Sequence, residues 1–427
     1  MKYVFEIMQQ YLKRNKKSAV ILSLCIMLSV ALIVIVLSFC ITLVDIQACA
    51  SYRLYSENTA ITHEEIMQKV YSNDEYIANI GLGILLTLTS VLISVSSISA
   101  ALEINRGNKA KIIAMLSLIG AEQKHCNALL ISDALLLSVT AVPAGLFLGL
   151  VVSTYIVAYL NKFVIIPKGF NEVYLLGGNP VFWCVVIIII SIVALLLSCS
   201  KQVFGKSKIS EIDIVKSYNA VDISLKPTIL DKVFGKLFGY YGELASGNYH
   251  NHKKSFRKFS LSVSLSATLF ISISSAFKYL ASNLKSGDGK IIKSFELFFY
   301  IFVLSVFTIT LISSVATLYA SFLKRKYEFA ILQSIGIEDK GIFKLVIIEN
   351  VYYALYMLIF ILIGGVIGNF IVFNILSSTN HTITFVYPYS EILISIFVVI
   401  VLTACISLMM TRITKTLNIA DELKKSF

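Results

Sequence analysis

Long apolar runs alternate with short polar segments along the whole chain, and this pattern predicts its helices. A membrane-spanning helix needs about 20 predominantly apolar residues. Eight runs of that kind occur, and each predicts one span. The predicted spans lie near residues 19–44, 77–102, 131–159, 181–200, 259–282, 297–321, 346–376 and 392–411. The expected fold class is therefore an all-α polytopic membrane protein.

The composition agrees with a membrane protein and excludes an ordinary soluble domain. Hydrophobic residues make up 57% of the chain and charged residues only 15%, whereas soluble domains carry about 25% charged residues. The mean hydropathy is +0.81. The first apolar run is too long for a cleavable signal peptide, so we expect it to be the first span. The seven cysteines have no paired spacing and are expected to be small apolar residues.

Positive charges predict the orientation, because Lys and Arg in short loops stay on the cytoplasmic side of a membrane. They gather before the first span and after the second, fourth, sixth and eighth spans, so both termini are expected in the cytoplasm. The opposite segments are poorer in positive charge, except for Lys162, Lys168 and the cluster at 285–293. The net charge of +12 is thus a topology signal, with anionic membrane lipids as the partner rather than nucleic acid.

Two stretches far apart in the chain repeat one another: LSLIGAEQKHC at 116–126 and LQSIGIEDKGI at 332–342. The similar strings NKKS at 15–18 and HKKS at 252–255 precede the first span of each half. Further pairs align at the spacing of the repeated stretch: Asp133 with Glu349, and Gly149 with Gly365. Because corresponding segments lie on the same predicted side, the chain is expected to form two parallel repeats of four spans each.

The repeated stretch predicts a cytoplasmic helical hairpin in each half, at 106–130 and at 322–346. A helix-like apolar pattern leads to Gly120 or Gly336, whose tolerance of positive φ suits a helix stop. A second helix then carries the chain into the next span.

An amphipathic segment precedes each repeat, at 1–17 and within the linker 218–258. We expect each to form a helix lying flat on the membrane; a helix packed against the spans is the alternative. The second apolar stripe consists of Ile229, Val233, Phe234, Leu237, Phe238, Tyr241 and Leu244. The four-span repeats then cover 18–217 and 259–427, with a small extracellular segment at 46–76.

The string KRKYEFAILQSIGIEDKGIFKLVIIEN at 324–350 resembles the signature of the FtsX-like permease family. In that family a basic and acidic pair precedes an A-I-L-x-x-I-G run, and a carboxylate opens a glycine-rich span. The matching residues are Arg325, Glu328, Ala330, Leu332, Ile335, Gly336 and Glu349, followed by GGVIG at 364–368. In the first half, Arg106 or Lys109 stands as the basic member, but Ile112 stands where the acidic member is expected.

This resemblance implies the membrane subunit of a MacB-type, or type VII, ABC transporter. It implies that two copies of a separate ABC ATPase, which hold ATP and magnesium, dock on the hairpins. The expected coupling residues are Arg106, Lys109, Leu116, Ile119, Gly120 and Glu122 in the first hairpin, and Arg325, Glu328, Leu332, Ile335, Gly336 and Glu338 in the second. For the basic residues, a role as topology signals at the membrane boundary is the alternative.

The chain itself is not expected to be an enzyme or to bind a cofactor. Its closest approach to a P-loop, SKQVFGKS at 200–207, lacks the first glycine. The histidines show no metal-ligand spacing. Asp133 and Glu349 stand at span entrances, where they are expected to cap helices or pair with the basic hairpin. Serines in the second and fifth spans predict close helix packing, with a hydrophilic conduit as the alternative.

By analogy with the family, closure of the ATPases moves the spans by mechanotransmission. The expected result is export, or extraction from the outer leaflet, of an amphiphile: an antimicrobial or signalling peptide, or a lipid-like molecule. The small extracellular segments favour a bacterium with a single membrane. Two other classes stay open, namely a module that controls a sensor kinase or cell-wall hydrolase, and a membrane enzyme or ion-driven carrier, which would need buried carboxylates.

Overall fold

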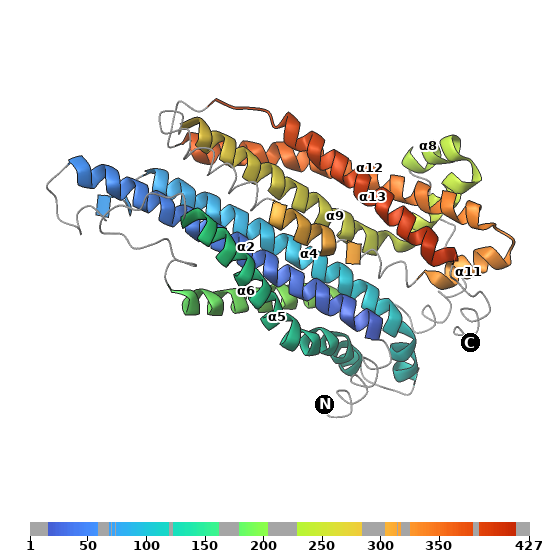
Figure 1. The fold of residues 1–427 in the computed structure, drawn as a ribbon. Coiled ribbons are helices and arrows are strands. Elements are labelled where there is room, and N and C mark those ends of the chain that lie inside the picture. Colours follow the sequence, from blue (N-terminus) through green and yellow to red (C-terminus); the bar gives the residue numbers. More distant parts are fainter. Residues whose placement is uncertain are drawn as a thin grey trace.

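The computed structural model is an elongated bundle of helices (Figure 1). It describes residues 16–58, 68–69, 71–72, 74–118, 123–161, 179–203, 229–283, 304–313, 315–316, 325–378 and 384–415. The labelled helices are α2 (Lys16–Asn58), α4 (Asp74–Leu118), α5 (Gln123–Asn161), α6 (Pro180–Val203), α8 (Ile229–Phe238), α9 (Tyr240–Asn283), α11 (Lys326–Ser334), α12 (Asp339–Ser377) and α13 (Tyr389–Lys415). None of the described residues belongs to a β-strand.

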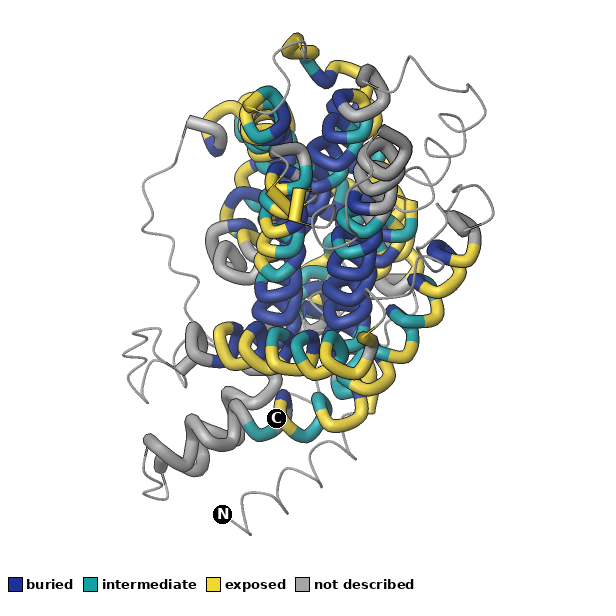
Figure 2. Tube along the Cα trace, turned by 90° about the vertical axis from the view of Figure 1, so that its left-hand side faces the viewer, coloured by how far each residue is buried: buried dark blue, intermediate teal, exposed yellow. Residues whose placement is uncertain are grey.

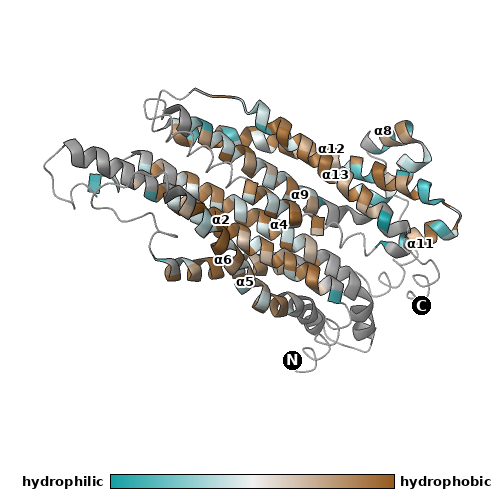
Figure 3. Ribbon diagram, in the orientation of Figure 1, coloured by the Kyte–Doolittle hydropathy of each residue, from teal (hydrophilic) through white to brown (hydrophobic). Residues whose placement is uncertain are grey.

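Seven helices in the described part of the chain are long and apolar enough to cross a membrane. Their candidate spans are Ala19–Thr42, Tyr76–Leu102, Ala134–Ala158, Val181–Cys199, Phe259–Tyr279, Asp339–Ser377 and Tyr389–Met410. Apolar residues follow these helices, and hydrophilic residues gather around α11 and the start of α12 (Figure 3). Of the span predicted near 297–321, the structure describes a shorter apolar helix, Leu304–Ser313, and residues 315–316. The arrangement of eight spans therefore stays a prediction.

Buried apolar residues form three clusters. The first joins α2, α4, α5 and α6, and the second joins α8, α9, α11, α12 and α13. The third contains residues of α2, α4, α9 and α12 and therefore connects the two halves. Within the most apolar stretch of each span, 72% of residues are buried in both α2 and α9, against 17% in α5 and 28% in α12. The first span of each half thus lies in the centre, and burial falls toward the flanks (Figure 2).

Glycines let the third span of each half approach the first span closely. A Cβ added at Gly149 of α5 would lie 2.6 Å from the Cβ of Val34 in α2. A Cβ added at Gly365 of α12 would lie 2.6 Å from the Cδ1 of Ile271 in α9. Close approach through small residues is how helices gain contact inside a membrane.

The serines of the second and fifth spans pack between helices, as predicted. Ser94 of α4 is fully buried and donates a hydrogen bond to the carbonyl oxygen of Ser29 in α2 at 3.1 Å. The hydroxyl oxygens of Ser97 and Ser313 lie 2.6 Å apart and join α4 to the helix Leu304–Ser313. Ser260, Ser262, Ser264 and Ser266 of α9 are also buried. Packing rather than a hydrophilic conduit therefore accounts for these side chains.

The amphipathic stripe predicted before the second repeat does not form one helix. α8 ends at Phe238, Gly239 adopts a positive φ of 59°, and α9 then begins at Tyr240. Tyr241 and Leu244 consequently belong to a helix that continues into the fifth span. Glycine at the break explains the division, because few other residues adopt positive φ without strain. Residues 1–15, which hold most of the other predicted interfacial helix, lie outside the described residues.

α8 shows features of both arrangements that the sequence left open. Asp231 and Phe234 are buried on the side that contacts α12, as a helix packed on the bundle requires. Val233 and Leu237 on the remaining surface are 42% and 69% exposed. α8 therefore packs on the bundle with one face and leaves an apolar face open.

Candidate coupling site at the α11–α12 hairpin

α11 and α12 form a helix–turn–helix at the end of the bundle where α2 begins and α13 ends (Figure 1). Gly336, in the turn, has a φ of 98°. Its backbone N–H donates to the carbonyl of Gln333 at 3.0 Å, and the N–H of Ile337 donates to the carbonyl of Leu332 at 3.1 Å. These two bonds make a Schellman motif, in which glycine ends a helix. The predicted helix stop at Gly336 is confirmed.

The turn presents an exposed apolar side chain between charged ones. Ile335 is 74% exposed, although it is a large hydrophobic residue. Glu338, Asp339 and Lys340 follow it and are exposed as well. The side chain of Gln333 donates to Asp339 Oδ1 at 2.9 Å across the turn. A turn already held in one conformation loses little entropy when a partner binds, which suits a docking surface.

Behind the turn, a buried arginine joins the first helix of the hairpin to the second. Arg325 at the start of α11 donates from Nη1 to Glu349 Oε2 at 2.7 Å and from Nη2 to Glu349 Oε1 at 2.9 Å. Arg325 is 1% exposed and Glu349 is fully buried. Asn248 of α9 donates to Glu349 Oε1 at 2.7 Å. Because a bidentate pair fixes the orientation of both side chains, it fastens the hairpin to α12 and, through Asn248, to α9.

Burial and charge act in opposite directions on Arg325. Removal from water disfavours the guanidinium cation, but the carboxylates of Glu349 and Glu328 outweigh this and raise the pKa of Arg325. Arg325 Nε donates to Glu328 Oε2 at 3.0 Å, and the cation lies 5.2 Å from the centre of the Phe329 ring. Arg325 therefore stays charged at physiological pH. Loss of Glu349 would remove the main counter-charge of a buried cation.

A tyrosine cluster packs α8, α9 and α12 around this ion pair. The ring centre of Tyr249 in α9 lies 4.6 Å from that of Tyr352, 5.7 Å from that of Tyr353 and 5.3 Å from that of Tyr356. Tyr352 also donates to Asp231 of α8 at 2.7 Å. Burial, and then the neighbouring Tyr356, raises the pKa of Tyr249. The cluster is therefore neutral at physiological pH and supports the ion pair by packing.

The structure gathers the coupling residues predicted in the second half around this one hairpin. Arg325, Glu328 and Glu349 form the ion pairs, whereas Leu332, Ile335, Gly336 and Glu338 shape the turn. Pairing of Glu349 with the basic hairpin is confirmed as its structural use. Coupling to an ATPase stays a prediction for all of these residues.

The counterparts in the first half cannot be placed in the same way. Arg106, Lys109 and Leu116 fall within α4, and Asp133 falls within α5, but their side chains lie outside what the structure describes. Ile119, Gly120 and Glu122 lie outside the described residues altogether. The first hairpin at 106–130 therefore stays a prediction.

The sequence pattern did not reveal two buried polar contacts. Asn248 reaches Glu349 from a distant part of the chain, and no spacing rule predicts that pairing. Glu391, at the start of α13, is only 3% exposed; it pairs with Lys278 of α9 and accepts a hydrogen bond from Ser390 at 2.9 Å. A lone carboxylate directly before an apolar run was its only signal. Both buried carboxylates face a cation, which is a structural arrangement. Within the described ranges, no three or more His, Cys, Asp or Glu side chains gather as a metal ion would require.

Fold and hairpin together define a polytopic α-helical membrane protein with a fixed helical turn at one end of its bundle. The family model described as FtsX-like permease C-terminal matches two segments, residues 77–208 and 298–419, which cover more than half of the chain. The chain belongs to the FtsX-like permease family. Membership indicates a membrane component of the ABC-transporter type, and such families generally work with ATPase subunits. Neither a curated protein nor a solved structure matches the chain.

Proposed function

We propose that this chain is the membrane-spanning subunit of an ABC transporter, with two separate ATPase subunits docked on its hairpins at 106–130 and 322–346. The α11–α12 hairpin carries the proposal. Its turn exposes Ile335, and the buried pair of Arg325 with Glu349 joins the turn to a span helix. A push on the turn would therefore move α12 instead of bending a loop.

The hairpin end of the bundle faces the cytoplasm in this proposal, because the basic segments of the sequence gather at that end. Both termini are then cytoplasmic, as ATPase docking requires. ATP and magnesium bind to the partner subunits, and this chain supplies no catalytic group. The small segments on the other side suit a bacterium with a single membrane.

Mechanotransmission along α12 links the two sides of the membrane. The helix has 39 residues, and at about 1.5 Å per residue it is longer than the hydrocarbon core of a bilayer, about 30 Å. One uninterrupted helix thus runs from the hairpin across the membrane. It packs closely on α9 through Gly365, so the two helices are expected to move as one body when the ATPases close.

The proposed substrate is an amphiphile that is exported, or extracted from the outer leaflet. An antimicrobial or signalling peptide is the first candidate, and a lipid or lipoprotein-like molecule is the second. Family analogy supports this class of substrate. The same joint would also serve a non-transporting module that controls a sensor kinase or cell-wall hydrolase. Stimulation of ATP hydrolysis by an added peptide or lipid distinguishes transport from that signalling role.

The docking proposal is tested by counting ATPase copies on the purified chain with native mass spectrometry, without nucleotide. Ile335→Asp should reduce the count from two copies toward one, because it places a charge on the apolar part of one docking turn. Ile335→Leu, which keeps the side chain apolar, should retain two. The side chain is exposed, so neither variant disturbs the core. Retention of two copies by Ile335→Asp would contradict docking at this turn.

A further inference from the structure

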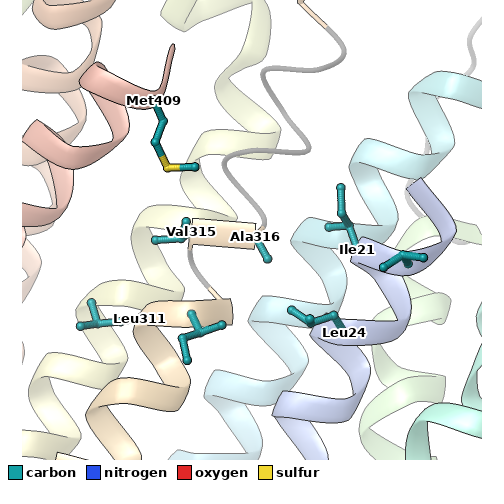
Figure 4. Close-up of a pocket in the computed structure, with 8 residues that line it drawn as sticks. Ile21, Leu24, Leu311, Val315, Ala316 and Met409 are labelled. Carbon is teal, nitrogen blue, oxygen red and sulfur yellow. The ribbon is translucent and has the colours of Figure 1, made fainter. Parts of the chain in front are cut away.

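A groove of about 430 Å³ lies between the two halves of the protein (Figure 4). This volume is within the range of small-molecule sites, about 300–1,000 Å³. The eight residues that line it are all apolar: Val20, Ile21, Leu24, Leu311, Ile312, Val315, Ala316 and Met409. No polar side chain in this lining would hydrogen-bond the backbone of a peptide. The groove therefore suits a hydrocarbon chain.

The walls of the groove come from both halves. Ile21 and Leu24 of α2 lie on one side and Met409 of α13 on the other, with Leu311 and Val315 between them (Figure 4). These α2 and α13 residues belong to candidate membrane spans. Val20, at 62% exposed, and Met409, at 42% exposed, face the surroundings of those spans. The groove thus opens sideways toward lipid rather than toward water.

Two cations flank one end of the groove. Lys16 precedes Val20 by one turn of α2, and Arg412 follows Met409 by one turn of α13. Residues three or four apart share one face of a helix, so both cations lie on the faces that line the groove. Both are exposed. A negatively charged group at this end would meet a positive charge from each half.

We propose that the groove binds one anionic phospholipid, with its phosphate between Lys16 and Arg412 and an acyl chain against the apolar lining. The charge of the flanking residues favours an anionic lipid over a zwitterionic one. Such a lipid would contact α2 of the first half and α13 of the second, and so would join the halves at the end of the bundle that carries the α11–α12 hairpin. This site is independent of the proposed docking of an ATPase.

Tryptophan fluorescence in lipid nanodiscs tests the proposal. The chain has one tryptophan, Trp183, so a Trp183→Phe background is free of other emitters. Ile312→Trp then reports on the groove, and Met409→Trp on its opposite wall is a second reporter. Val139→Trp is the control, because Val139 is 72% exposed on α5 and does not line the groove. Nanodiscs of zwitterionic lipid receive a small fraction of brominated phosphatidylglycerol or brominated phosphatidylcholine.

Brominated phosphatidylglycerol should quench the groove reporters more strongly than brominated phosphatidylcholine, whereas the two lipids should quench Val139→Trp equally. The double variant Lys16→Glu/Arg412→Glu should remove the difference. Lys236→Glu, which reverses an exposed charge on α8, should retain it. Equal quenching of the groove reporters by both lipids would overturn the proposal. Absence of quenching by either lipid would also overturn it, because the groove would then be covered by protein.

Discussion

The two halves share the packing of their spans. Gly149 of α5 faces Val34 of α2, and Gly365 of α12 faces Ile271 of α9. The two glycines align in the repeated sequence, and Val34 and Ile271 occupy the same position counted from the NKKS and HKKS strings. The same contact between a first and a third span therefore occurs twice, as a duplicated arrangement requires.

The hairpins of the two halves differ in chemistry. Lys109, Ile112 and Asp133 occupy the positions of Arg325, Glu328 and Glu349. Lysine lacks the planar fork that binds a carboxylate through two parallel hydrogen bonds, and isoleucine cannot pair with a cation. Helix packing inside the membrane is thus the feature common to both halves, whereas the stiff ionic joint belongs to the second. We expect unequal contributions from the two hairpins.

Loss of the counter-charge to Arg325 should give the largest effect. Glu349→Leu should lower the free energy of unfolding by about 3–5 kcal/mol, because a buried cation loses its partner. SDS titration in mixed micelles measures this change. The double variant Arg325→Met/Glu349→Leu should recover most of the loss.

The equivalent change in the first half, Asp133→Leu, sharpens the comparison. It should cost less than Glu349→Leu, since Lys109 cannot make the bidentate contact. Equal losses in the two halves would show that the hairpins are energetically the same.

The glycine contacts should respond next, and unequally. At Gly149, a new methyl group would meet the Cβ of Val34 and, at 3.1 Å, the backbone carbonyl of Ala31, so Gly149→Ala should cost about 1–3 kcal/mol. At Gly365 it would meet the movable end of Ile271, so Gly365→Ala should cost less. The same titration measures both. A larger loss for Gly365→Ala would contradict the geometry of the two contacts.

Gly336→Ala should have a smaller effect that is confined to the turn. An added Cβ has no atom within 4 Å, so the cost comes from the positive φ alone, about 1–2 kcal/mol. Hydrogen exchange should become faster at the amides of Gly336 and Ile337, with little change along the rest of α12. Unchanged exchange at these two amides would mean that the Schellman motif does not hold the turn.

Glu328→Gln should have the smallest effect. The Glu328 side chain is 43% exposed, and exposed ion pairs contribute about 0–1 kcal/mol. Arg325 also keeps its bidentate contact with Glu349. A loss as large as that of Glu349→Leu would move the centre of the joint to Glu328 and weaken the contrast with Ile112.

The sequence predicted the spans well because long apolar runs determine them. The runs at 19–44 and 181–200, for example, became Ala19–Thr42 and Val181–Cys199. The stop at Gly336 was also predictable, since glycine there follows a helical pattern and precedes charged residues. Helix ends beyond the membrane were not: α4 reaches Leu118 and α9 begins at Tyr240. Those extensions are polar, so hydropathy carries no signal for them.

The candidate site was only partly predictable for a similar reason. Glu349 stood out as a carboxylate beside an apolar run, and its basic partner lay nearby in the motif. Asn248 and Tyr249 surround the same site but come from the preceding half of the hydrophobic bundle, on α9. Their contacts depend on how α9 packs against α12, which the order of residues along the chain does not reveal.

The most direct test of the transmission joint is ATP hydrolysis by the chain bound to its cognate ABC ATPase in nanodiscs, for wild type and Arg325→Lys. This variant keeps the buried charge but gives the second hairpin the basic residue of the first. Glu328→Gln is the matched control. The account predicts that Arg325→Lys retains both ATPase copies but hydrolyses ATP more slowly than the wild type and the control. Hydrolysis at the wild-type rate would contradict a role for the bidentate pair in transmitting the motion of the ATPase.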